Sequence, residues 1–146
     1  MTTTFQTRSE EETIKKARAL GKRALPTGVV LLFGNLGTGK TVFVRGLVEA
    51  AGGRSDEVTS PTFTLIQQYT GAHSVHHVDL YRIKRDEIEE LGLDELMAGP
   101  GLVAIEWAEK LPRSPTDAFQ VYIEDKGQDL REFRIEQNNT YGGSCI

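Results

Sequence analysis

The strongest constraint on the fold is the segment GNLGTGKT, residues Gly34 to Thr41. It matches the pattern GxxxxGK[ST], whose glycines adopt backbone angles that a side chain would block, so that successive N–H groups can turn inward around a phosphate. In this pattern the lysine, Lys40, reaches the β- and γ-phosphates of a nucleotide, and the hydroxyl of Thr41 binds Mg²⁺. The segment therefore predicts a site for a nucleotide and a magnesium ion.

The residues on either side have the periodicity that a phosphate-binding loop requires. An apolar run typical of a buried strand, Val29 to Phe33, precedes the loop, and apolar residues at helical spacing, Val42 to Ala51, follow it. The loop thus leads into a helix N-terminus, where the free N–H groups and the helix dipole favour an anion. We assign to cofactor binding the residues Asn35, Leu36, Gly37, Thr38, Gly39, Lys40, Thr41 and Val42.

Composition restricts the class of protein. With 146 residues, of which 38% are hydrophobic and 26% charged, the chain is typical of one globular domain, predicted over residues 1–137, with a tail at 138–146 that we expect to be disordered. We expect a cytoplasmic protein without a membrane span or a signal peptide. Because Cys145 is the single cysteine, we also expect no disulfide within the chain. A net charge of −4 argues against a broad nucleic-acid surface.

Periodicity and turn residues predict the other elements. A capping box at Ser9 to Glu12 opens an amphipathic helix that stops at Pro26, and a weak helix with Gly92 in its middle spans 86–96. Further strands are predicted at 63–69, 73–78 and 102–105, followed by a hairpin of 119–124 with 131–136 around residues 126–129. This order predicts an α/β fold with three layers, the P-loop NTPase fold: a mixed, largely parallel sheet with the loop strand near its centre and a C-terminal antiparallel hairpin.

Two acidic residues follow apolar strands downstream of the loop. Asp79 comes after HSVHHV, and Glu106 comes after LVAI. Nucleotide hydrolysis requires a held Mg²⁺ and a water oriented for in-line attack, and carboxylates at the ends of buried strands suit both tasks. We nominate Asp79 and Glu106 as catalytic and, with Thr41, as metal-binding residues, without separating the two tasks between them. The alternative for either acid is an ordinary solvated carboxylate at a strand end.

Three further features have two interpretations each. The segment TSPTF has hydroxyls suited to sensing a γ-phosphate, or it is a polar turn fixed by its proline. Trp107 is a core side chain or a platform for a base. The histidines of HSVHH point to opposite faces of a strand, which favours structural or surface roles over a metal site. The segment TSPTF consists of Thr59, Ser60, Pro61, Thr62 and Phe63.

Five motifs in order resemble the TsaE family of bacterial P-loop ATPases: GNLGTGKT, TSPTFTL, HHVDLYR, ELGLDEL and AIEWAEKL. The phosphate loop alone is shared by a superfamily, whereas SPTFTL, VDLYR and IEW at these spacings are specific to one family. The family is required for threonylcarbamoyladenosine (t6A) modification of tRNA. The resemblance implies ATP and Mg²⁺ as cofactors, a switch-like loop at 59–63, catalytic and magnesium residues at Asp79 and Glu106, and a place near the nucleotide for Trp107.

The resemblance also implies partners. The family acts with a threonylcarbamoyl transferase, TsaD, and its paralogous scaffold, TsaB, which carry the modification chemistry and through which tRNA is met. The function implied is that of a Mg-dependent ATPase, slow without partners, which resets or reorganises that complex between turnovers.

Other nucleotide-binding functions have weaker support in the sequence. A small-molecule kinase needs an acceptor pocket and a lid with several arginines, for which Arg82 and Arg85 are the nearest candidates. A GTPase needs the guanine-reading motif [NT]KxD, but residues 83–86 read IKRD. A structural subunit that binds ATP without hydrolysing it stays open, because motifs indicate binding more directly than turnover.

Overall fold

A central sheet of seven strands organises the molecule, in the order β1-β7-β6-β2-β5-β4-β3. The computed structural model describes residues 2–35, 39–58 and 65–137, so the predicted tail at 138–146 lies outside the described residues. The strands are β1 (Thr2–Thr7), β2 (Thr27–Phe33), β3 (Ile66–Thr70), β4 (Ser74–Asp79), β5 (Gly101–Glu106), β6 (Phe119–Gly127) and β7 (Leu130–Gln137).

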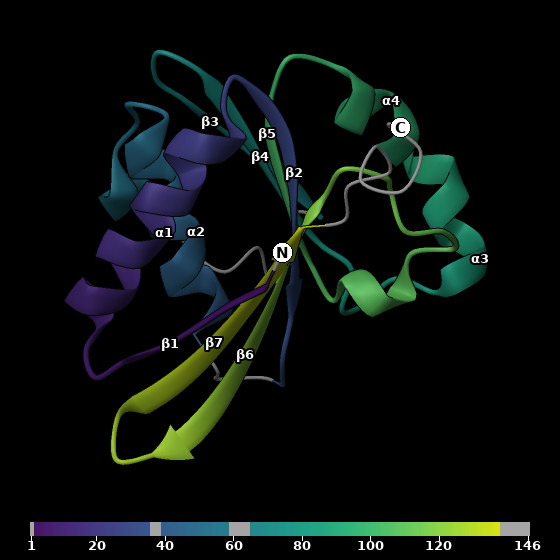
Figure 1. The fold of residues 1–146 in the computed structure, drawn as a ribbon. Coiled ribbons are helices and arrows are strands. Elements are labelled where there is room, and N and C mark those ends of the chain that lie inside the picture. The colour runs from purple at the N-terminus through teal and green to yellow at the C-terminus, as the bar shows by residue number, and fades with distance from the viewer. Residues whose placement is uncertain (1, 36–38, 59–64, 138–146) are drawn as a thin grey trace, which may run out of the picture.

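Helices cover the two faces of the sheet separately (Figure 1). The long helices α1 (Glu10–Ala24) and α2 (Lys40–Ala50) lie against one face, and the short helices α3 (Arg85–Ile88) and α4 (Leu93–Ala98) lie on the other. The predicted three-layer α/β arrangement is therefore confirmed. Short 3₁₀ turns complete the connections: η1 (Ser55–Glu57), η2 (Glu89–Leu91) and η3 (Ala108–Lys110).

The sheet is mixed, as predicted, and its parallel part is the centre. β2 is the middle strand and pairs in parallel with β5 and β6, and β5 pairs in parallel with β4. Antiparallel pairs lie toward the two edges, where β3 joins β4 and where β7 joins β6 and β1. The carboxyl ends of β2, β4 and β5 therefore meet at one edge of the sheet, where open α/β sheets bind their ligands.

The N-terminal strand β1 is absent from the elements expected from the sequence. It pairs with β7 in antiparallel register, and the ring of Phe5 stacks on that of Phe133 at a centroid distance of 4.9 Å. Most of β1 is exposed, so its threonines lack the apolar alternation that reveals a half-buried strand. The pairing brings the start of α1 close to the hairpin of β6 and β7.

Helix α1 begins at the predicted cap. The Oγ atom of Ser9 accepts a hydrogen bond of 3.1 Å from the backbone N–H of Glu12. The Glu12 carboxylate reaches back to the N–H of Arg8, at 2.6 Å, one residue before the position that a capping box requires.

The interface of α1 and α2 is close enough to require glycine. A Cβ atom added at Gly46 of α2 would lie 2.5 Å from the Cβ of Ala17 and 2.5 Å from the carbonyl oxygen of Ile14, both in α1. The two helices therefore fix each other's position. Apolar side chains fill the space between these helices and the sheet: among them are Leu20, Val30, Leu32, Phe43, Leu47, Val121 and Phe133.

Turns divide the remaining chain as the sequence indicated. Gly92, with φ of 71°, separates η2 from α4, which explains the weak helical pattern of residues 86–96. In the hairpin the turn residues Gln128 and Asp129 both have positive φ, 53° and 66°, as a tight turn between twisted strands requires.

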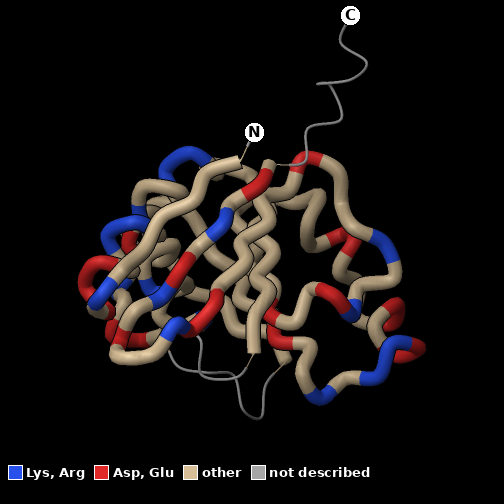
Figure 2. Tube along the Cα trace, turned by 60° about the horizontal axis from the view of Figure 1, so that its bottom comes forward, with Lys and Arg blue, Asp and Glu red and all other residues tan. Residues whose placement is uncertain are grey.

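Charged side chains are spread over the outside of the molecule. Figure 2 shows acidic and basic residues along the helices and the hairpin, with the central strands uncharged over most of their length. Among the described helices, none has the length and apolar character to cross a membrane.

Candidate nucleotide-binding site

The ends of three neighbouring strands form the floor of the candidate site. In the register of the sheet, Glu106 of β5 lies opposite Leu32 of β2 on one side and opposite Asp79 of β4 on the other. The structure thus brings the two predicted acids together, beside the strand that leads into the phosphate loop. Parallel pairing is the cause, because it aligns the carboxyl ends of strands that are far apart in the sequence.

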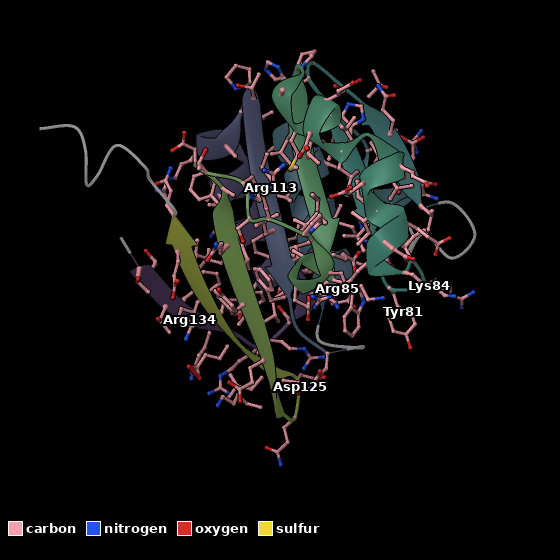
Figure 3. The ribbon with its side chains drawn as sticks, turned by 90° about the vertical axis from the view of Figure 1, so that its right-hand side faces the viewer. Tyr81, Lys84, Arg85, Arg113, Asp125 and Arg134 are labelled. Carbon is pink, nitrogen blue, oxygen red and sulfur yellow. The ribbon has the colours of Figure 1, made fainter. Side chains whose placement is uncertain are left out.

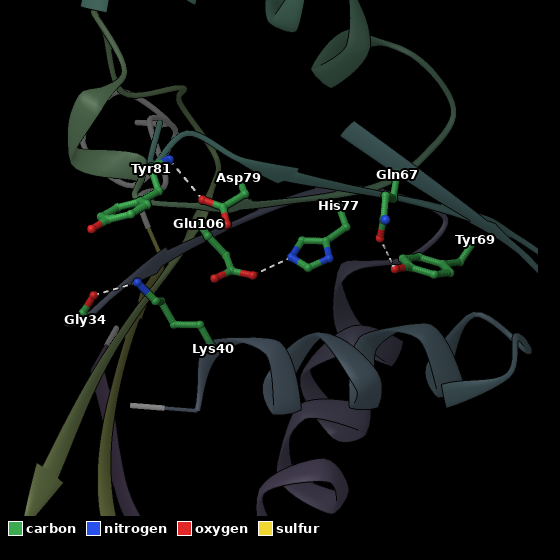
Figure 4. Close-up of polar contacts among 8 residues, drawn as sticks. All are labelled: Gly34, Lys40, Gln67, Tyr69, His77, Asp79, Tyr81 and Glu106. Atoms are coloured by element: carbon green, nitrogen blue, oxygen red, sulfur yellow. Dashed lines mark hydrogen bonds and ion pairs between the residues drawn. The ribbon is translucent and has the colours of Figure 1, made fainter. Parts of the chain in front are cut away.

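Lys40 faces these acids from the first residue of α2. Its Nζ atom donates a hydrogen bond of 2.7 Å to the carbonyl oxygen of Gly34, and the residue is 4% exposed (Figure 4). Burial lowers the pKa of Lys40, and the nearby carboxylates of Glu106, Glu109 and Asp79 oppose that effect. The result is a partly desolvated cation at a helix N-terminus, an environment in which its attraction to a phosphate is stronger than in water.

Gly39 precedes Lys40 with φ of 107°, a conformation that a Cβ atom disfavours. The other assigned loop residues divide into three groups. Thr41 and Val42 line the cavity described below, whereas Asn35 is described but does not line it. Leu36, Gly37 and Thr38 lie outside the described residues, as do the residues of the predicted switch-like loop, Thr59, Ser60, Pro61, Thr62 and Phe63.

Trp107 covers the lysine. The Lys40 Nζ atom lies 4.0 Å from the centroid of the Trp107 ring, which is a cation–π contact. The centroids of the Trp107 and Tyr81 rings are 5.0 Å apart. Trp107 also packs against the apolar core under α3 and α4. Trp107 therefore belongs both to the edge of the core and to the wall of the site, and its role as a platform for a base stays a prediction.

Asp79 is half-buried at the end of β4. One of its oxygens, Oδ1, accepts a hydrogen bond of 2.9 Å from the backbone N–H of Tyr81. Burial raises the pKa of Asp79, as does the carboxylate of Glu106, while the Tyr81 hydrogen bond lowers it. The desolvated carboxyl would therefore gain from a cation placed beside it.

Glu106 is 4% exposed, and its Oε2 atom lies 2.5 Å from Nε2 of the fully buried His77 (Figure 4). Sequence reasoning did not place any histidine at the site. The available signal was spacing, because His77 and Asp79 are two residues apart on one strand and so face the same side of the sheet.

A cavity of about 650 Å³ opens above these groups, within the range usual for sites that bind small molecules. One wall is the start of α2 with Asp79, Glu106 and Trp107. The other wall comes from the junction of β1 with α1 and from the turn of the hairpin. The cavity is lined by Arg8, Ser9, Glu10, Thr13, Gly39, Lys40, Thr41, Val42, Asp79, Glu106, Trp107, Asp129 and Arg131.

The second wall contains two arginines that sequence reasoning missed. Arg131 faces the same side of β7 as the buried Phe133, and its Nε atom lies 3.9 Å from where a Cβ on Gly39 would be. Arg8 follows β1, the strand that the sequence did not reveal. The arginines considered from the sequence do not line the cavity, and Arg85 instead donates to the carbonyl oxygen of Glu109 at 3.3 Å (Figure 3).

The donors present suit magnesium. Within the described ranges no group of three or more His, Cys, Asp or Glu side chains could hold a metal. The cavity instead offers the Thr41 hydroxyl and the carboxylates of Asp79 and Glu106, all oxygen donors. Mg²⁺ is commonly bound in this way, through one or two carboxylates, with substrate phosphates and water completing its shell.

Comparison with known proteins gives one consistent result. The family model for the threonylcarbamoyl adenosine biosynthesis protein TsaE matches residues 7–133. The chain is 40% identical to the tRNA threonylcarbamoyladenosine biosynthesis protein TsaE of Bacillus subtilis over 97% of this chain and 90% of that protein. It is 41% identical to the protein of the same name from Rickettsia bellii, over 84% of this chain and 87% of that protein.

The fold comparison agrees with the sequence comparison. The crystal structure of Bacillus subtilis YdiB superposes with a TM-score of 0.76 at 32% identity, covering 99% of this chain and 92% of that one. Since the family model spans most of the chain and these relatives match along nearly their whole length, the chain belongs to the TsaE family.

Proposed function

We propose that this chain binds and hydrolyses ATP, with Mg²⁺, as the ATPase of tRNA threonylcarbamoyladenosine biosynthesis. The observation that carries the proposal is the placement of Lys40 at the start of α2, facing Asp79 and Glu106 across one cavity. The names of the relatives support the pathway, because each is a tRNA threonylcarbamoyladenosine biosynthesis protein.

The polar side chains Lys40, Thr41, Asp79 and Glu106 of the first wall each have a role in this proposal. Lys40 exchanges the Gly34 carbonyl for oxygens of the β- and γ-phosphates, which compensate its charge better than a neutral carbonyl does. The Thr41 hydroxyl with one of the carboxylates, Asp79 or Glu106, would hold Mg²⁺, which when bound would supply positive charge to neutralise the phosphates. The carboxylate not engaged in direct metal contact orients the attacking water.

The second wall receives the rest of the nucleotide. With the phosphates at the N-terminus of α2, the remaining space of the cavity lies toward Arg8, Glu10 and Arg131. The arginines add positive charge beside the phosphates, and the carboxylate of Glu10 can accept hydrogen bonds from ribose hydroxyls or a base amino group. The N-terminal strand and the hairpin thereby take part in binding.

The proposed setting is the cytoplasm, where the chain acts on the transferase TsaD and its scaffold TsaB and meets tRNA through them. The carbamoyl transfer belongs to those partners, and ATP turnover resets their complex. A small-molecule kinase has no specific support, because neither Arg82 nor Arg85 lines the cavity.

Replacing the lysine tests the proposal directly. Lys40→Ala removes a desolvated charge-assisted contact, so Mg-ATP affinity is expected to fall by about 10- to 100-fold, measured by isothermal titration calorimetry. Lys15→Ala, at an exposed position of α1, is the matched control and should bind like the parent. Equal ATP affinity in Lys40→Ala and the parent would refute the proposed site.

A further inference from the structure

His77 makes a contact that the proposed function does not yet use. It lies in the interior of β4, with its side chain 0% exposed, and its Nε2 atom is 2.5 Å from Oε2 of Glu106. Its other ring nitrogen, Nδ1, is buried and has no hydrogen-bond partner among the described residues. Among the described residues, Glu106 thus provides the polar contact of an otherwise enclosed ring.

The surroundings hold the ring in place. His77 lies opposite Gln67 of β3 and opposite Ala104 of β5, so strands flank it on both sides. The ring of Tyr69 lies 6.5 Å away on centroids, and the Tyr69 hydroxyl bonds Gln67 rather than the histidine (Figure 4). A histidine enclosed in this way has little freedom to turn its Nε2 atom away from Glu106.

The geometry also determines what the histidine does to the carboxylate. With Nδ1 unpartnered and Nε2 beside an oxygen, the arrangement fits a ring that donates its Nε2–H to Oε2 of Glu106. Figure 4 shows the other oxygen of Glu106 turned away from His77, on the side of Lys40. One oxygen is therefore held by the sheet interior, and the second is directed to the cavity.

We propose that His77 is a positioning residue that fixes the orientation of the Glu106 carboxylate so that its free oxygen can bind the magnesium ion of the nucleotide complex. This inference rests on the proposed function. A carboxylate ligand that is held by a hydrogen bond behind it binds metal more tightly than one that rotates, and removing such a support commonly costs about 10- to 100-fold in metal affinity or activity.

Four variants separate positioning from packing. His77→Phe keeps a ring but removes the donor, and His77→Gln keeps an N–H donor at nearly the place of Nε2. His77→Asn stays polar but is too short to reach Glu106. His76→Phe is the matched control, because it changes the neighbouring histidine on the opposite face of β4, where there is no contact with Glu106.

The primary measurement is Mn²⁺ binding to the ADP complex, followed by electron paramagnetic resonance, with ADP affinity in chelator as the companion measurement. We expect His77→Phe and His77→Asn to lower Mn²⁺ affinity by about tenfold or more, with metal-free ADP affinity unchanged. His77→Gln should recover most of the affinity, and His76→Phe should match the parent. The Mg²⁺ concentration for half-maximal hydrolysis should rise in His77→Phe and His77→Asn.

The outcomes separate this inference from the proposed function. If the parent binds Mn²⁺ with ADP and folded His77→Phe binds it equally well, the positioning role is overturned. Should His77→Phe fail to fold, the comparison of His77→Asn with His77→Gln decides, and equal Mn²⁺ affinities in these two variants overturn the role. A parent that shows no metal-dependent nucleotide binding refutes the proposed function itself.

Discussion

The ammonium group of Lys40 lies against the ring face of Trp107, 4.0 Å from its centroid, while it bonds the Gly34 carbonyl. A phosphate that draws the ammonium away changes the environment of the indole, and Trp107 is the chain's single tryptophan. Intrinsic fluorescence should therefore change saturably with Mg-ATP in the parent. Lys40→Ala should lack this change at the same concentrations, and an identical titration curve in both proteins would contradict the contact between phosphate and Lys40.

Arg131 provides a test of the second wall. Arg131→Ala should weaken ATP binding by about tenfold or more, because a hydrogen bond to a charged group contributes about 1.5–3 kcal/mol. Arg134→Ala is a close control, because it removes a cation from the same strand. Arg134, labelled in Figure 3, faces the other side of the sheet and forms an ion pair with Glu136, as Arg131 does with Asp125. Equal losses in the two variants would show that the hairpin's stability, rather than contact with ATP, is responsible.

The raised pKa of Asp79 predicts a pH dependence of stability in the nucleotide-free protein with chelator. A carboxyl group that ionises less readily in the folded protein stabilises the fold below its ordinary pKa of 3.8, and this contribution is lost as pH rises through the higher, folded value. Asp79→Asn keeps the acceptor for the Tyr81 N–H but has no charge to desolvate. The free energy of unfolding of Asp79→Asn, minus that of the parent, should therefore increase as pH rises from below 3.8 toward neutrality.

Urea denaturation at several pH values measures this difference. Asp94→Asn, at an exposed position of α4, controls for the loss of one negative charge. A difference between Asp79→Asn and the parent that stays constant with pH, or that shrinks as pH rises, would contradict the burial of this carboxyl.

Gly46 tests how closely α1 and α2 must approach. Alanine in place of glycine normally stabilises a helix interior by up to about 1 kcal/mol. At Gly46, however, the new Cβ would meet the backbone of α1 at 2.5 Å, so we expect Gly46→Ala to destabilise the protein by about 1–3 kcal/mol. Because the two helices start at opposite walls of the cavity, ATP affinity should fall as well. A more stable Gly46→Ala protein, measured by urea denaturation, would contradict this packing.

Local pattern was sufficient to predict the first wall of the site. The strand before Gly34, the helix after Thr41 and the acids at two strand ends all follow from short-range periodicity and spacing, and parallel pairing then brings Asp79 beside Glu106. The family motifs supplied the same residues independently.

The second wall depends on pairing between the two ends of the chain, which no local pattern reveals. Arg8 reaches the cavity because β1 adds to β7, and Arg131 because the hairpin packs beside α2. The contact of His77 with Glu106 also joins two strands, although the spacing of His77 from Asp79 put both on one face. Sequence reasoning therefore nominated the groups that we propose to bind phosphate and metal, but not those that surround or support them.

Steady-state phosphate release tests the central claim most directly. It should be measured for this chain alone, with the transferase and scaffold proteins added, and with tRNA present, using Glu106→Gln as the variant that keeps shape but removes the charge. We predict slow phosphate release by the chain alone and an acceleration of at least tenfold with the partners, because completing an ATPase site in trans is typically worth about 10³- to 10⁵-fold in rate. Glu106→Gln should release little phosphate in any mixture. Fast release by the chain alone that ignores the partners, or equal release by Glu106→Gln, would contradict the account.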